Sequence, residues 1–153
     1  MKKFWIFPVL LLMLTGCERD DLCLQQPVPH TVIRLRDYAT GQPKPAQSLT
    51  VSWHDQILFS ASETDSVAFY LPPQDGPVDL TFSLQSDTVS QADTVIFDYQ
   101  LHERFLSKAC GFGLTFDSLR IQVIDRGAVW IKRVEVLQPG VETDTLAHAN
   151  FYY

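Results

Sequence analysis

Apolar and polar side chains alternate along most of the chain beyond residue 30. The clearest run covers residues 78–85, in which every second side chain is apolar. A period of two predicts a β-strand with one buried and one exposed face. The same pattern, with turns rich in Pro, Gly and Asp between its runs, predicts further strands at 31–37, 49–54, 57–59, 66–71, 94–106, 112–124, 129–137 and 146–153.

This pattern predicts an all-β domain over residues 31–153. No window carries the i, i+3, i+4, i+7 repeat of an amphipathic helix over three turns. Eight or nine strands spaced by turns predict an antiparallel β-sandwich with immunoglobulin-like or related topology. A barrel is the alternative, and the pattern does not decide between the two. Residues 60–65 are polar and predict a turn.

The first 16 residues have the pattern of a signal peptide. Lys2 and Lys3 precede an apolar run over residues 4–14 that only Pro8 interrupts. As a helix this run is roughly 16 Å long, too short to span about 30 Å of hydrocarbon. A basic start followed by a short apolar core predicts a secretory signal.

The end of this segment, Leu14-Thr15-Gly16-Cys17, resembles the lipobox of bacterial lipoproteins. The resemblance implies diacylglyceryl transfer to the Cys17 sulfur, cleavage after Gly16 and acylation of the new amine. Residues 17–30 are then a lipidated tether. The alternative is a plain signal peptide with an incidental cysteine.

Acidic residues follow at once in Glu18-Arg19-Asp20-Asp21. They resemble the surface-export signal of Bacteroidetes-type lipoproteins. We expect a lipid-anchored protein of the outer membrane, either on the cell surface or on the periplasmic side. The net charge is −6, and loss of Lys2 and Lys3 with a signal peptide lowers it by two to −8. Such a charge disfavours nucleic acids and anionic lipid surfaces as partners.

Three cysteines are present. If Cys17 is acylated, Cys23 and Cys110 remain as an even pair in an oxidising compartment. A bridge between them closes a loop of about 87 residues, for which the chain-entropy relation gives about 4–5 kcal/mol before native strain. Two buried free thiols are the alternative.

The sequence offers no established catalytic or metal-binding motif. His54-Asp55 and His102-Glu103 are sequence neighbours, so in a strand their side chains point to opposite faces, which is poor geometry for a base and its orienting acid. The chain has no C-x-x-C motif. The four histidines have no ligand spacing, and they stand at positions 30, 54, 102 and 148. We therefore expect no enzymatic activity, no metal and no cofactor.

Four stretches resemble a family of small uncharacterised Bacteroidetes-type lipoproteins, classed as a domain of unknown function. They are residues 17–23 (CERDDLC), 105–112 (FLSKACGF), 130–136 (WIKRVEV) and 148–153 (HANFYY). The resemblance covers the whole chain after the signal segment. It implies a pair between Cys23 and Cys110 and an extracytoplasmic lipoprotein, and it carries over no catalytic residue and no ligand.

We expect a non-enzymatic binding or structural module of the cell envelope that is held at the membrane by its N-terminal lipid. Its partner is another envelope protein or a carbohydrate. One alternative is an accessory carrier that holds a hydrophobic ligand between its sheets. The other is an enzyme with an unfamiliar site at His54 or His102.

Overall fold

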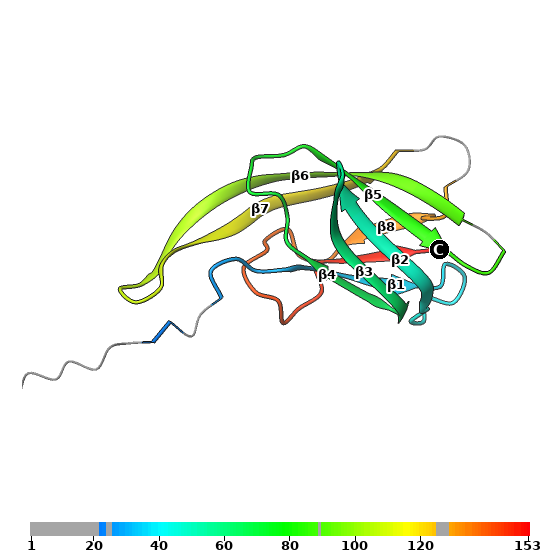
Figure 1. Cartoon of the computed structure of the whole chain (residues 1–153), viewed down its shortest axis with the longest axis horizontal. Coiled ribbons are helices and arrows are strands. Elements are labelled where there is room, and N and C mark those ends of the chain that lie inside the picture. Colours follow the sequence, from blue (N-terminus) through cyan, green and yellow to red (C-terminus); the bar gives the residue numbers. More distant parts are fainter. Residues whose placement is uncertain (1–21, 24–25, 89, 125–128) are drawn as a thin grey trace, which may run out of the picture.

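The structure is a computed structural model of the whole chain, and it describes residues 22–23, 26–88, 90–124 and 129–153. In these residues nine strands form two sheets that pack face to face (Figure 1). The strands are β1 (Thr31–Arg36), β2 (Ala46–Trp53), β3 (Gln56–Thr64), β4 (Ser66–Phe69), β5 (Val78–Gln85), β6 (Ser90–Ser107), β7 (Gly111–Val123), β8 (Arg133–Val136) and β9 (Ala149–Tyr152).

One sheet has four strands in the order β4-β1-β9-β8, and the other has five in the order β3-β2-β5-β6-β7. Neighbouring strands run antiparallel, except that β1 and β9 are parallel. Two separate sheets confirm the predicted all-β sandwich over the alternative of a barrel. In the part of the chain described here, no helix is long and apolar enough to cross a membrane.

Aromatic rings fill the space between the sheets. The ring centroid of Phe82 on β5 lies 6.2 Å from that of Phe69 on β4 and 5.3 Å from that of Phe151 on β9. Phe97 on β6 stacks on Phe82 at 6.1 Å. None of these four side chains is more than 1% exposed. The apolar face predicted for residues 78–85 therefore lies in the core, and Phe151 is buried as predicted.

The turn predicted at residues 60–65 is wrong, because β3 continues to Thr64 and pairs with β2 along most of its length. β3 is the outer strand of its sheet, and its side chains are exposed or half-buried. A strand without a fully buried face carries no apolar alternation, so its polar sequence resembles a turn.

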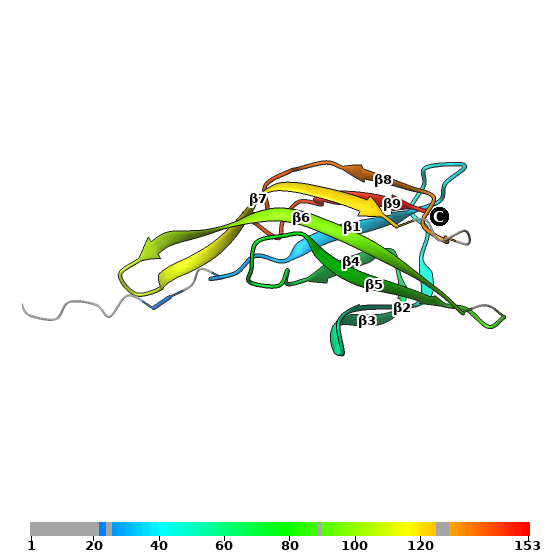
Figure 2. The same ribbon diagram turned by 90° about the horizontal axis from the view of Figure 1, so that it is seen from above.

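β6 and β7 form a long hairpin that extends beyond the other strands of both sheets (Figures 1 and 2). We call residues 101–116 the arm and residues 105–112 its tip. At the base of the arm the β6–β7 register shifts between Asp98 and Gln100, where Ser118 of β7 has a φ of 57°. An extra residue in one strand bends the hairpin, and this bend accompanies the curvature of the arm in Figure 1.

The outer edge of β7 is covered by segments from elsewhere in the chain. The backbone N–H of Leu114 donates to the carbonyl of Pro27 at 2.7 Å. Further along the strand, the N–H of Phe116 donates to the carbonyl of Val141 at 3.2 Å. Covering an edge in this way protects it from pairing with another chain.

Candidate functional site

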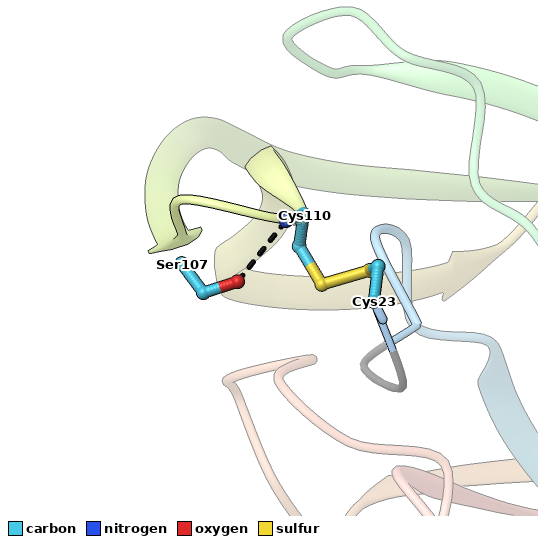
Figure 3. Close-up of a disulfide and its surroundings, with 3 residues drawn as sticks. All are labelled: Cys23, Ser107 and Cys110. Carbon is cyan, nitrogen blue, oxygen red and sulfur yellow. Dashed lines mark hydrogen bonds between the residues drawn. A yellow bond between two sulfur atoms is a disulfide. The ribbon is translucent and has the colours of Figure 1, made fainter. Parts of the chain in front are cut away.

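A disulfide joins Cys23, at the start of the described chain, to Cys110 at the tip of the arm (Figure 3). The two Cα atoms are 4.8 Å apart, although 87 positions separate the residues in sequence. The backbone N–H of Cys110 also donates to the Ser107 hydroxyl at 3.0 Å, which orders the turn. The predicted pairing of these two cysteines is therefore confirmed, and the alternative of two free thiols is wrong. The predicted lipidation residue, Cys17, lies outside the described residues.

The segment after the disulfide lies against the arm. Gly113 allows this close approach, because a Cβ at that position would lie 2.5 Å from the Pro27 carbonyl oxygen. Val28 is partly buried and packs against the core. Part of the segment predicted as a tether, residues 26–30, is thus bound to the sandwich.

Side-chain contacts hold the same segment at a third place. The Nδ1 atom of His30 lies 3.0 Å from Oδ2 of Asp144, and the His30 ring stacks on Tyr70 with 4.0 Å between centroids. Gln26 donates a hydrogen bond of 3.0 Å to the Tyr70 hydroxyl. Beside these contacts is an open, mainly apolar groove of about 350 Å³ whose wall includes Leu114.

A polar groove of about 390 Å³ lies at the base of the arm, where the β6–β7 register shifts. Arg120 of β7 and Asp98 of β6 form an ion pair across it, with 2.9 Å between Nη2 and Oδ2. The Asp75 carboxylate accepts a hydrogen bond of 2.8 Å from the backbone N–H of Leu101. Positively and negatively charged side chains are thus both exposed to water in the polar groove, and hydrogen bonds hold the backbone beneath them.

Tyr99 stands behind the polar groove. Its hydroxyl is buried and donates to the carbonyl of Pro72 at 2.8 Å. Burial raises the pKa of Tyr99, and the nearby Asp75 carboxylate raises it further. The hydroxyl therefore stays protonated and keeps its donor role at all physiological pH values.

His102 lies in the wall of the polar groove, and its charged partner is Asp117 of β7, with 3.6 Å between Nε2 and Oδ2. The sequence predicts poor geometry for His102 with its neighbour Glu103, and it does not identify Asp117 as the cross-strand partner. The available signal was the hairpin itself: in the register, Gln100 faces Asp117 and His102 faces Thr115, equally spaced about the turn at residues 108–109. His102 and Asp117 are therefore diagonal neighbours.

The other histidine considered from sequence, His54, lies in the turn between β2 and β3 and is exposed. Its ring centroid is 4.9 Å from that of Trp53. His54 therefore lies at the β2–β3 turn, away from the β6–β7 pair that carries His102. Among the residues that the structure describes, no three His, Cys, Asp or Glu side chains gather as metal ligands.

His148 is buried, with 1% of its surface exposed. Its Nδ1 atom accepts a hydrogen bond of 3.0 Å from the backbone N–H of Val32 in β1. Burial lowers the pKa of His148, and the charge of Asp144 opposes this only in part. The imidazole is therefore neutral in the folded protein at neutral pH.

Acid should weaken the fold through His148. The unfolded chain, with an ordinary histidine pKa of about 6.5, binds a proton that the folded chain resists, so stability falls as the pH drops below about 6.5. One such group changes the free energy of unfolding by at most about 1.4 kcal/mol for each pH unit. We expect His148→Asn, which keeps an acceptor for Val32, to show a smaller loss than wild type between pH 7 and pH 5 in denaturant titrations.

The matched control for this prediction is His54→Asn. His54 is exposed and has a φ of 50°, a conformation that Asn tolerates. This variant should keep the wild-type dependence of stability on pH. Equal pH dependence in His148→Asn and wild type would contradict the assigned role of His148.

The fold and these contacts define a class of protein: an all-β sandwich whose projecting hairpin is fastened by a disulfide to the start of the domain. Residues 48–153 match a family of unknown function (DUF6452), and the chain belongs to this family. No curated protein and no solved structure matches the chain. The match confirms the expectation of an uncharacterised domain, whereas the Bacteroidetes origin and the lipoprotein character stay predictions.

Proposed function

We propose that the protein is a lipid-anchored, non-enzymatic module of the outer membrane that binds another envelope protein or a carbohydrate. In this proposal Cys17 carries the acyl chains and the sandwich faces either the periplasm or the outside. The observation that carries the proposal is the Cys23–Cys110 disulfide, which begins six residues after the lipobox cysteine. Such bonds persist in extracytoplasmic compartments and are rare in the cytosol.

The polar groove at the base of the arm is the part of the surface that we assign to the partner. Its Arg120 side chain is 79% exposed while still paired with Asp98, so the guanidinium is available to a second acceptor. His102 and Asp117 are about half exposed and add a donor and an acceptor nearby. Sugar hydroxyls and peptide groups both bind to such a mixed set of polar side chains.

The carrier alternative has one supporting feature, the apolar groove beside Val28 and Leu114. It lies at the surface near the arm, whereas the aromatic rings of Phe82 and its neighbours occupy the space between the sheets. The exposed His102–Asp117 pair is the corresponding feature for an enzyme. Its separation of 3.6 Å and its contact with water favour a weak surface pair over a buried base with its orienting acid.

Site-specific photo-crosslinking in cells tests this proposal. A photo-reactive residue at Gln100, which is exposed in the polar groove, should trap a defined envelope partner. The same residue at Ser60, exposed on the outer strand β3, is the matched control and should trap none of it. Asp98→Ala together with Arg120→Ala should remove most of the product at position 100. Identical products at positions 100 and 60, or no product at position 100, would contradict the assigned surface.

A further inference from the structure

We propose that the tip of the arm inserts its aromatic side chains into the same bilayer that holds the lipid anchor. This inference rests on the proposed acylation of Cys17. At the tip, Phe105 of β6 faces Phe112 of β7 in the register, and their ring centroids are 5.5 Å apart. The two side chains are 57% and 67% exposed. A pair of exposed phenylalanines at the end of a projecting hairpin is costly in water.

The disulfide places this pair close to the anchor. Cys110 lies at the turn of the tip and is bonded to Cys23 (Figure 3). Cys23 is six positions after Cys17, and even a fully extended chain of six steps spans at most about 22 Å. The Cα of Cys110 is 4.8 Å from that of Cys23, so it lies within roughly 27 Å of the Cα of Cys17. The rest of the sandwich extends away along the arm (Figures 1 and 2).

The chemistry of the tip suits the boundary between headgroups and acyl chains. Leu22 is 81% exposed and directly precedes Cys23, which is bonded to Cys110 in the tip. It therefore adds an exposed apolar side chain at this end of the molecule. Lys108 is exposed in the turn itself, where its long side chain can keep the ammonium among headgroups while its methylenes lie deeper. Because the chain after the lipobox is strongly acidic, the surface that fits is zwitterionic rather than anionic.

A second copy of the chain is a less suitable occupant. A stable protein interface covers about 800 Å² on each partner. Phe105 and Phe112 are only two side chains, and the exposed charged residues Glu103 and Arg104 precede Phe105 on β6. A bilayer needs no matching shape and accepts a tip of this size.

Quenching by brominated lipids tests the insertion. The acylated protein carrying Phe112→Trp is reconstituted into phosphatidylcholine vesicles with bromine near the start of the acyl chains. We expect the added emission to fall by about half or more, because interfacial side chains lie about 5–10 Å into the headgroup boundary. Phe105→Trp should behave in the same way and replaces the first variant if that one folds poorly.

Two references complete the experiment. Wild type gives the emission of Trp53 and Trp130, which is subtracted. Ile57→Trp is the matched control, because Ile57 is 69% exposed but lies on β3, at the opposite edge of the sheet from β7. Its added emission should be unchanged by bromine.

Flotation of the same vesicles tests the lipid anchor at Cys17 separately from the insertion of the tip. Failure of the wild-type protein, with Cys17 intact, to float overturns the anchor and the inference with it. Flotation without greater quenching at position 112 than at position 57 overturns the inference alone. If the tryptophan at position 112 is instead shielded only at high protein concentration and without bromine quenching, a second copy covers the tip and the bilayer does not.

Discussion

Replacing Cys17 with Ala should release the protein from membranes into the soluble fraction outside the cytoplasm. The two or three acyl chains of a bacterial lipoprotein bury dozens of methylenes at about 0.8 kcal/mol each, so their loss removes almost all of the anchoring free energy. The two exposed phenylalanines of the tip supply only a small part of it. We expect at least a tenfold fall in the membrane-bound fraction, measured by fractionation and vesicle flotation.

Cys23→Ser is the control for this prediction. It also removes a cysteine near the N-terminus but leaves the lipobox complete, so the protein should stay on the membrane. Continued membrane retention of Cys17→Ala would contradict the lipoprotein interpretation, because the two phenylalanines of the tip are too few to hold the protein there without the acyl chains.

Cys110→Ser should lower the melting temperature under oxidising conditions by roughly 10–20 °C. The disulfide closes a loop with a sequence separation of 87 residues. In the chain-entropy relation, opening a loop of that length lowers the free energy of unfolding by about 4–5 kcal/mol. The measurement is thermal unfolding followed by circular dichroism.

Three controls define the origin of the shift. Cys23→Ser should melt at the same temperature as Cys110→Ser, and the double variant should melt no lower, since all three lack one and the same bond. Wild type should shift to that temperature in reductant. If Cys110→Ser leaves melting unchanged and wild type shows two reactive thiols, the disulfide is absent from the protein in solution.

The strands with one fully buried face are the part of the fold that the sequence predicts best. The run at residues 78–85 coincides with β5, because this strand lies inside its sheet and packs one face on the core. β3 was predicted too short because it is an outer strand with no fully buried face. Alternation reports burial of a face, so it fails where neither face is buried.

The segment predicted as a strand at residues 129–137 is shorter in the structure, where β8 covers Arg133–Val136. The preceding residues use their polar groups differently. The indole N–H of Trp130 donates to the carbonyl of Phe82 at 3.1 Å, and the backbone N–H of Ile131 donates to Asp93 at 2.8 Å. A side-chain acceptor from a distant strand thus takes the place of a ladder partner, which periodicity alone does not show.

Part of the candidate site was predictable as well. An even pair of cysteines indicated the disulfide, since only two partners were left once Cys17 was assigned to the lipid. The polar groove was not predictable, because it depends on the register shift beside Ser118 that brings Asp98 and Arg120 together. The exposed rings at the tip were not predictable either. Alternation places Phe105 on one face of its strand, but it does not show how far the hairpin extends beyond the neighbouring strands.

Intact-mass spectrometry of the protein extracted from its native membrane without reductant tests the central claim most directly. A chain of residues 17–153 should appear, heavier by its acyl groups on Cys17 and lighter by the two hydrogens lost in the Cys23–Cys110 bond. A mass for the unmodified chain, or two added alkyl groups after treatment with a thiol reagent, would contradict a lipid-anchored sandwich clamped by this disulfide.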